Sequence, residues 1–163
     1  YLPENRKEEG LFVNRPVLEN ISLSNLKNFY KFPFLDSKKE QSKAEELVST
    51  LSIVTPNLLT EVKSLSGGNQ QKVVLARLLG VNCRILLLDE PTRGVDIGAK
   101  EDIYGIIDNL SKEGLAIILI SSEMEEVVEL SDKVVVLRKG KISRKLNKEE
   151  ISEENIMEAA VHY

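Results

Sequence analysis

The stretch that decides the fold is Leu65-Ser66-Gly67-Gly68-Asn69-Gln70-Gln71-Lys72, followed by Ile85-Leu86-Leu87-Leu88-Asp89-Glu90-Pro91-Thr92-Arg93-Gly94-Val95-Asp96. The first string is typical of a glycine turn that opens a helix, where free backbone N–H groups and the positive end of the helix dipole can face a phosphate. The second is typical of a buried strand that ends in two carboxylates, which suit a magnesium ligand and a base that orients water. Together they predict chemistry on a nucleotide phosphate.

One expected part of such a site is missing from the sequence. The phosphate-binding loop Gly-x-x-x-x-Gly-Lys-Ser/Thr, which an ATPase needs for its own nucleotide, does not occur in these 163 residues. The sequence also begins abruptly at Tyr1-Leu2-Pro3, as if cut inside or just after a strand. We therefore expect a fragment of a longer protein, cut before its phosphate loop, that supplies half of a catalytic site.

Composition narrows the remaining classes of function. Apolar residues make up 42% of the chain, which is enough for a folded core. The net charge of −4, with no basic run longer than Lys38-Lys39, argues against a nucleic-acid partner. Cys83 is the only cysteine, so a reducing compartment fits. With no apolar run near the roughly 20 residues of a membrane-spanning helix and no signal-peptide pattern, we expect a soluble, cytoplasmic protein.

Helical patterns occupy the first part of the sequence. Apolar residues recur at helical spacing over 17–30, after Pro16, and a Phe-Pro-Phe sequence at 32–34 ends that helix. Residues 36–53 form a second, amphipathic helical pattern. Because no strand pattern occurs before residue 66, we expect a helical subdomain over 11–66, preceded by a separate segment over 1–10.

Helix and strand patterns alternate from residue 67 to residue 163, where we expect a partial ATPase core. The expected elements are a helix over 70–79, a strand over 85–88, a helix over 103–110, a strand over 115–120, a helix over 123–130, a strand over 134–137, a turn at Lys139-Gly140 and a terminal helix over 149–160. Gly80 and Gly114 would end their helices, Gly80 as a left-handed cap. The two unbroken apolar runs predict parallel strands covered on both faces.

The chain resembles the second nucleotide-binding domain of the double-cassette ATP-binding cassette (ABC) ATPases that drive bacterial importers of ribose, galactose or xylose. The residues that carry the resemblance are 3–11, 19–23, 65–72, 89–100 and 120–124. The spellings Ser-Gly-Gly-Asn-Gln-Gln and Thr-Arg-Gly-Val-Asp are characteristic of that branch. The resemblance implies an α/β fold, a partial P-loop NTPase parallel sheet with an α-helical subdomain, lacking the phosphate-loop strand.

The resemblance also implies roles for the first string. Ser66, Gly67, Gly68 and Gln70 would form the signature motif, which contacts the γ-phosphate of a nucleotide held by the opposing domain. Gly68 would let the backbone approach that phosphate closely. Taken alone, the Ser-Gly-Gly sequence also fits an ordinary turn that caps a helix.

The second string receives three roles from the resemblance. Asp89 would be the Walker B carboxylate that holds Mg²⁺ through water, and Glu90 the base that orients the attacking water. Asp96 would be the D-loop aspartate that crosses the domain interface. Taken alone, the Leu-Asp-Glu-Pro sequence also fits a strand end with a solvated acidic turn.

Two positions depart from the family's active pattern. The histidine that senses the γ-phosphate should fall at Ser122, while the only histidine of the chain is His162. Ser122 also has a structural explanation, because residues 122–125 fit a helix capping box. Glu4 stands at the Q-loop position, where glutamine is usual. A carboxylate there can reach a metal, although helix entry or a surface role explains Glu4 equally well. These departures predict two unequal sites, with the signature serving the working one.

The resemblance further implies cofactors, partners and a location. The full-length protein would use ATP and Mg²⁺ and pair with the first nucleotide-binding domain of the same polypeptide. It would lie on the inner face of the cell membrane, with its helical subdomain docked on a transmembrane permease and a periplasmic or extracellular sugar-binding protein acting indirectly. A nucleoside importer and a non-catalytic ABC-like module in regulation or assembly are the alternatives. The fragment itself would self-associate through strand edges, or pair the 115–120 and 134–137 strands directly.

Overall fold

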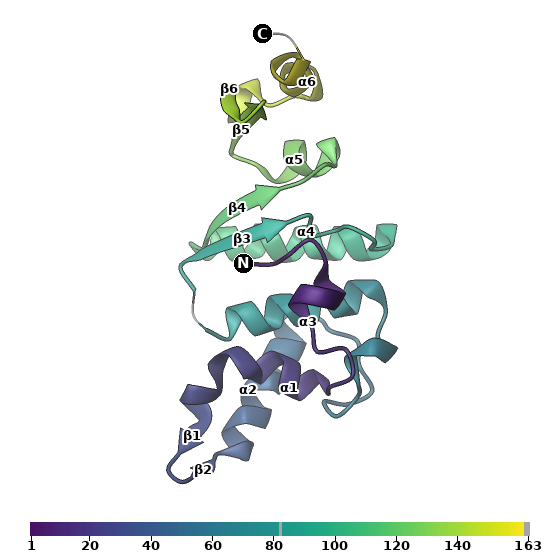
Figure 1. The fold of residues 1–163 in the computed structure, drawn as a ribbon, viewed down its shortest axis with the longest axis vertical. Helices are drawn as coiled ribbons and strands as arrows, with labels where there is room; N and C mark the ends of the chain where they lie inside the picture. The colour runs from purple at the N-terminus through teal and green to yellow at the C-terminus, as the bar shows by residue number, and fades with distance from the viewer. Residues whose placement is uncertain (82, 162–163) are drawn as a thin grey trace. The chain divides into compact units, whose positions relative to one another are not determined.

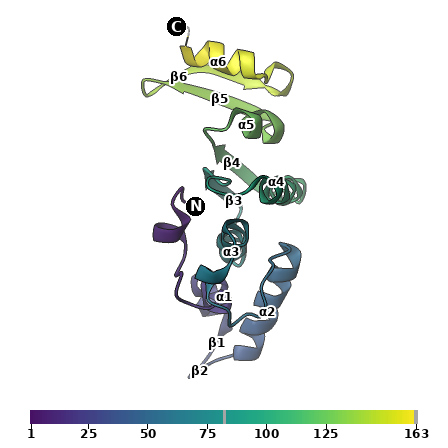
Figure 2. The ribbon, with the colours of Figure 1, turned by 90° about the vertical axis from the view of Figure 1, so that its right-hand side faces the viewer.

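The computed structural model describes residues 1–81 and 83–161. They form two compact units that divide between Ile118 and Leu119. Figures 1 and 2 show the course of the chain from two directions. No helix within the described residues is long and apolar enough to cross a membrane.

The first unit begins with a mainly helical region. Its elements are η1 (Arg6–Gly10), α1 (Val17–Ser22), η2 (Leu23–Phe29), β1 (Tyr30–Lys31), β2 (Phe34–Leu35), α2 (Ser37–Thr50) and η3 (Val62–Ser64). The predicted helices over 17–30 and 36–53 are confirmed by α1 with η2 and by α2. Asp36 begins α2 by accepting a hydrogen bond from the Lys39 backbone N–H at 3.1 Å. The expectation of no strand before residue 66 is wrong, because β1 and β2 form a short antiparallel hairpin.

Helix α3 (Gly67–Leu79) is the central element of the first unit. It contacts α1 and α2 on one side and α4 (Ile97–Lys112) on the other, and it lies between them in both views (Figures 1 and 2). Its residues from Gln70 to Ala76 are all buried, including three polar side chains. A helix that is buried on every side must pair its polar groups with neighbouring elements, and these pairs hold the surrounding loops.

Strand β3 (Ile85–Asp89) and strand β4 (Ala116–Ile120) pair in a two-stranded sheet, and α4 connects them, as the sequence predicts. The N-terminal segment adds to this sheet through a parallel bridge between Leu2 and Leu88. The Leu2 N–H donates to the Leu87 carbonyl at 2.8 Å, and the Asp89 N–H donates to the Leu2 carbonyl at 3.1 Å. The bridge holds the first residues against the carboxyl end of β3.

Two details of the sequence-based expectation are wrong. The strands are not covered on both faces: Leu86 and Leu88 are buried, whereas Ile85 and Leu87 are 60% and 39% exposed, because the described chain packs against only one side of β3. Gly80 is not a left-handed cap, since its φ of −57° and ψ of −20° continue the helical turn. By contrast, Gly114 after α4 has φ +93°, which a residue with a side chain rarely adopts.

The second unit contains α5 (Met124–Leu130), β5 (Lys133–Arg138), β6 (Lys141–Asn147), η4 (Lys148–Glu150) and α6 (Glu153–Val161). The predicted turn at Lys139-Gly140 is confirmed, with positive φ at both residues joining β5 to β6. The terminal helix begins at Glu153, later than predicted, because 148–150 form a separate turn closed by Asn147 and Glu150. The core of this unit consists of Val134, Val136, Leu146, Ile156 and Ala159.

The expected direct pairing between the 115–120 and 134–137 strands does not occur. Strand β4 pairs with β3, and β5 pairs with β6, in separate sheets. The antiparallel hairpin is local in sequence, so β5 obtains its partner across a two-residue turn at low entropic cost. Self-association, the other expected outcome, stays a prediction.

Candidate functional site

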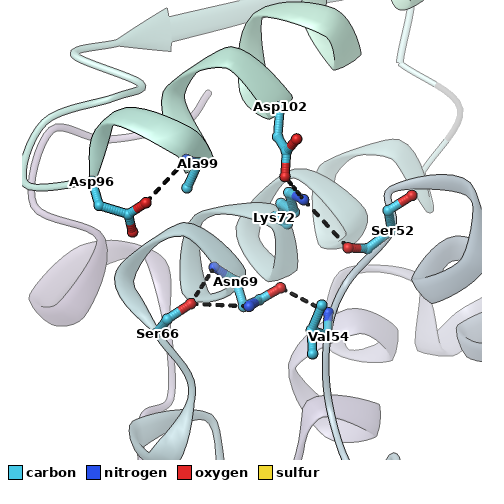
Figure 3. A network of polar contacts seen from close by, with 8 residues as sticks. All are labelled: Ser52, Val54, Ser66, Asn69, Lys72, Asp96, Ala99 and Asp102. Carbon is cyan, nitrogen blue, oxygen red and sulfur yellow. Dashed lines mark hydrogen bonds and ion pairs between the residues drawn. The ribbon is translucent and has the colours of Figure 1, made fainter.

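Ser66 stands at the exposed N-terminal end of α3. Its hydroxyl oxygen accepts hydrogen bonds from the Asn69 backbone N–H at 3.4 Å and from Asn69 Nδ2 at 2.9 Å (Figure 3). The Ser66 carbonyl accepts the first intrahelical bond, from the Gln70 N–H at 2.9 Å. The residue is therefore an N-cap, and the N–H groups of Gly67 and Gly68 in the first turn lack an intrahelical carbonyl, as at every helix start. This end of α3 is suited to a phosphate.

Close packing within the chain requires a glycine at position 68 and leaves little room for a side chain at position 67. A Cβ at Gly67 would lie 2.8 Å from Arg6 Nη2 and 3.1 Å from the Gly94 carbonyl oxygen. A Cβ at Gly68 would lie 2.5 Å from the Cβ of Ala99 in α4. Gly68 is buried, so the packing of α3 on α4 is by itself a sufficient reason for this glycine, and the close approach to a phosphate that the sequence suggests stays a prediction.

Gln70 is turned into the protein. Its side chain is 4% exposed, and its Nε2 donates to the carbonyls of Val62 at 3.2 Å and Leu65 at 3.1 Å. These bonds fix the loop that leads into Ser66. Gln70 was predicted to bind the nucleotide, and the structure gives its amide a supporting task behind the motif.

Two further side chains of α3 hold the loop that follows α2 (Figure 3). Asn69 Oδ1 accepts a hydrogen bond from the Val54 N–H at 2.7 Å. The Lys72 ammonium, 4% exposed, donates to the Ser52 carbonyl at 3.3 Å and to Asp102 Oδ2 in α4 at 2.8 Å. The signature helix is thus bonded to the loop after α2 and to α4.

The two carboxylates of the second string lie where β3 ends. Asp89 is the last residue of β3, and its Oδ2 accepts a hydrogen bond from the Tyr1 hydroxyl at 2.9 Å. This bond to the carboxylate raises the pKa of the Tyr1 phenol, because it favours the protonated form. Glu90 follows with φ +49°, in the left-handed region, so the backbone turns sharply between the two acidic residues.

Asp96 begins α4. Its Oδ1 accepts a hydrogen bond from the Ala99 N–H at 3.0 Å, so the predicted D-loop aspartate also caps a helix of its own chain (Figure 3). The loop before it is held by Arg6, whose Nη1 and Nη2 donate to the carbonyls of Arg93 at 2.7 Å and Gly94 at 3.1 Å. Burial lowers the pKa of the Arg6 guanidinium.

Glu4 pairs with Arg93 through its carboxylate in an exposed ion pair. The two residues line a hollow of about 440 Å³ together with Asn5, Arg6 and Lys7. The structure therefore brings residues 4–7 against the loop that precedes Asp96. Glu4 is engaged with a cation of the same chain, and its predicted contact with a metal stays a prediction.

Ser122 lies in the second unit and is exposed. The predicted capping box over 122–125 is wrong, because α5 has Glu123 as its N-cap and no side-chain cap hydrogen bond. Ser121 takes the local role instead, since its hydroxyl oxygen accepts a hydrogen bond from the Glu123 N–H at 2.9 Å. His162 lies outside the described residues.

Residues 3–93 match the ABC transporter family, and this segment is more than half of the chain. The chain belongs to the ABC transporter family. Its match begins just before Glu4 and ends at Arg93, so the N-terminal segment, the helical region and both carboxylates after β3 are inside it.

Ribose import ATP-binding proteins named RbsA are among the ABC relatives. The protein from Shouchella clausii is 48% identical over 160 residues, which are 98% of this chain and 32% of that protein. The RbsA 2 protein of Rubrobacter xylanophilus is 49% identical over 98% of this chain and 31% of its own length. The Bacillus subtilis protein is 43% identical over 160 residues, which are 98% of this chain and 32% of that protein. The chain spans about a third of the length of these relatives.

Solved structures show the same fold. A dimeric ATP-binding cassette in a post-hydrolysis state, bound to ADP and Pi, gives a TM-score of 0.70 at 24% identity and covers 85% of this chain and 59% of that one. A metal-chelate type ABC transporter in an inward-facing conformation gives a TM-score of 0.76 at 22% identity. This match covers 93% of this chain and 60% of that one. The predicted α/β ABC cassette fold, in partial form, is confirmed.

The residues of this cassette fit the expected ATP and Mg²⁺ only in part. The exposed N-terminus of α3 suits a phosphate presented by another domain. In the described part of the chain, no three His, Cys, Asp or Glu residues gather to hold a metal. Mg²⁺ usually keeps several waters and takes one or two carboxylates beside the phosphates, so Asp89 can supply one such contact and no more.

Sequence reasoning missed three residues that shape this site. Arg6 holds the loop at Arg93 and Gly94, Lys72 connects α3 to α4, and Asn69 connects Ser66 to Val54. A signal existed for two of them, because Asn69 and Lys72 lie inside the motif that decided the fold. Their spacing of three residues places them on one face of α3.

Proposed function

We propose that this chain is part of the ATP-hydrolysing subunit of a bacterial sugar importer of the ribose type, and that it supplies the signature motif, Walker B carboxylate and D-loop. The observation that carries the proposal is Ser66, an exposed N-cap on a helix whose residues from Gln70 to Ala76 are buried and which neighbouring elements fix on several sides. The names of the RbsA relatives support ribose as the sugar class.

In this proposal the chain's groups have separate tasks. Ser66 and the N–H groups of Gly67 and Gly68 stabilise the phosphate of a nucleotide held by the first nucleotide-binding domain, which pairs head to tail with this one. Such preorganised donors act on charge that develops during transfer. Bound Mg²⁺ neutralises charge between the β- and γ-phosphates. Asp89 and Glu90 would serve this domain's own nucleotide, and the family resemblance assigns Ser122 to the position of the usual histidine.

The proposed partners follow from the same arrangement. The helical region over 11–60 docks on a transmembrane permease at the inner face of the membrane, and a sugar-binding protein outside the membrane delivers the substrate to that permease. The subunit itself then selects no sugar. Its part is to convert ATP binding and hydrolysis into movement of the permease.

The proposal predicts opposite results for two preparations. The purified 163-residue chain is expected to show no ATP hydrolysis and at most very weak nucleotide binding, since its sequence has neither the backbone nest nor the lysine of a phosphate loop. The full-length ATPase, assembled with its permease in vesicles, is expected to hydrolyse ATP faster when ribose-loaded binding protein is added. Release of phosphate measures both. Magnesium-dependent turnover by the chain alone that disappears in Glu90→Gln contradicts the proposal.

We also predict that the purified chain self-associates through the open face of β3. Ile85 and Leu87 expose apolar side chains on this face, and neighbouring exposed apolar side chains favour contact with another protein surface. Replacing both with lysine is expected to shift the sedimentation coefficient to that of a monomer. Leu59→Lys is the matched control, because Leu59 is 72% exposed and lies outside the sheet. A monomeric wild-type chain at tens of micromolar would rule this surface out.

A further inference from the structure

We propose that Asn69 is a positioning residue that points the Ser66 hydroxyl proton outward, toward a phosphate oxygen of the nucleotide on the opposing domain. The inference rests on the proposed function, because it needs Ser66 to meet that nucleotide. Beyond the proposed function, it assigns a role to Asn69, which acts through Ser66 and connects the motif to the loop after α2.

The orientation of the Asn69 amide is set by the backbone. The Val54 N–H can only donate, and at 2.7 Å it takes the oxygen end of the amide, Oδ1. The NH₂ end must then face the other way, where Nδ2 lies 2.9 Å from Ser66 Oγ (Figure 3). A flipped amide would place a donor against the Val54 N–H and lose that bond, so the Val54 N–H decides the orientation.

The Ser66 hydroxyl keeps its proton as a hydrogen-bond donor for a further partner. A hydroxyl has two lone pairs and one proton, and Ser66 Oγ accepts from Asn69 Nδ2 and from the Asn69 backbone N–H at 3.4 Å. Its own proton is the group that remains for a further partner. Since Ser66 is exposed, that proton can be donated to an acceptor beyond the chain, and phosphate oxygens are acceptors.

The loop that fixes Asn69 is itself held at a second point. Lys72 binds the Ser52 carbonyl two residues before Val54, and its buried ammonium also pairs with Asp102 of α4. Ser52 has φ +49°, a conformation that costs energy and that the surrounding contacts maintain. Asn69 and Lys72 therefore hold the loop over 52–54 against α3, and the direction of the Ser66 proton depends on where that loop lies.

The test uses Asn69→Asp, which nearly preserves the shape of the side chain. A carboxylate still accepts from the Val54 N–H, but it presents an acceptor to Ser66 where the amide presented a donor. The Ser66 proton then turns inward to the carboxylate. In the assembled transporter, we expect kcat for ATP hydrolysis to fall about a hundredfold, as for loss of one preorganised donor. Ser66→Ala is expected to cause a similar loss.

The double variant separates this mechanism from simple charge repulsion. In a Ser66→Ala background, Asn69→Asp is expected to change kcat hardly at all, because the group that it redirects is already absent. A carboxylate that repels the phosphate directly would lower kcat again in that background, and this result overturns the inference. If Ser66→Ala itself leaves kcat unchanged, the proposed function fails together with the inference. If only Asn69→Asp is without effect, the inference alone fails.

A second readout does not depend on activity. In the purified 163-residue chain, hydrogen exchange of the Val54 N–H is expected to accelerate about tenfold in Asn69→Ala and to stay slow in Asn69→Asp. The Leu59 N–H is the internal control, because it donates to Asn57 Oδ1 at 2.8 Å in a similar bond away from Asn69. Equal exchange of the Val54 N–H in the wild type and in Asn69→Ala overturns the assigned orientation of the amide.

Discussion

Ser66→Ala in the assembled transporter is expected to lower the steady-state ATPase rate about a hundredfold, whereas Glu90→Gln is expected to leave most of the rate intact. In the proposed function, the first substitution removes a donor from the site that the opposing domain completes. The second alters a carboxylate that would serve this domain's own nucleotide, and the family resemblance assigns Ser122 to the position of the usual histidine. An enzyme with two equal sites would need both residues equally.

Steady-state phosphate release from the two variants, reconstituted side by side with the same permease, measures this asymmetry. Ser121→Ala is a suitable control for handling and assembly, because its hydroxyl serves only local bonds with Glu123. Equal and near-complete loss in Ser66→Ala and Glu90→Gln would show that this domain's own pocket is required.

Elements with local signals were predictable from the sequence. The helix over 37–50 carries its own cap at Asp36, and the turn at Lys139-Gly140 carries the residues that its positive φ values require. Short strands such as Tyr30–Lys31 leave no periodic pattern to detect. The exposure of Ile85 and Leu87 depends on what covers the sheet, and an apolar run is compatible with either outcome.

The positions of the motif residues were predictable, but several of their contacts were not. Ser66 is an exposed helix cap, which the Ser-Gly-Gly sequence alone also indicates, and its predicted contact with a phosphate stays a prediction. The inward turn of Gln70 and the bond from Asn69 to Val54 both depend on loops whose course is set by tertiary packing. A motif in a sequence identifies which residues share a site, while their partners from distant segments decide which ones face a ligand.

Gly68→Ala is expected to lower the free energy of unfolding of the chain by about 1–3 kcal/mol, the usual cost of forcing a methyl group into a packed interface. The new Cβ would stand 2.5 Å from the Cβ of Ala99, and a backbone-attached methyl in a helix cannot rotate away. Alanine gains up to about 1 kcal/mol over glycine inside a helix, and this gain is smaller than the clash. Urea unfolding measures the difference.

Ala99→Gly should rescue the variant, and this rescue identifies the clash as the cause. Alone, Ala99→Gly is expected to cost about 0.5–1 kcal/mol of helix stability, and the double variant should be nearly as stable as that single one. Gly105→Ala is the matched control: the space around its Cβ is open, so the same substitution within α4 should stabilise the chain by about 0.5–1 kcal/mol. A Gly68→Ala variant that is as stable as the wild type or more stable would mean that the packing of α3 on α4 does not require Gly68. Close approach of a phosphate would then be the better explanation for this glycine, and Gly68→Ala would act on catalysis more than on folding.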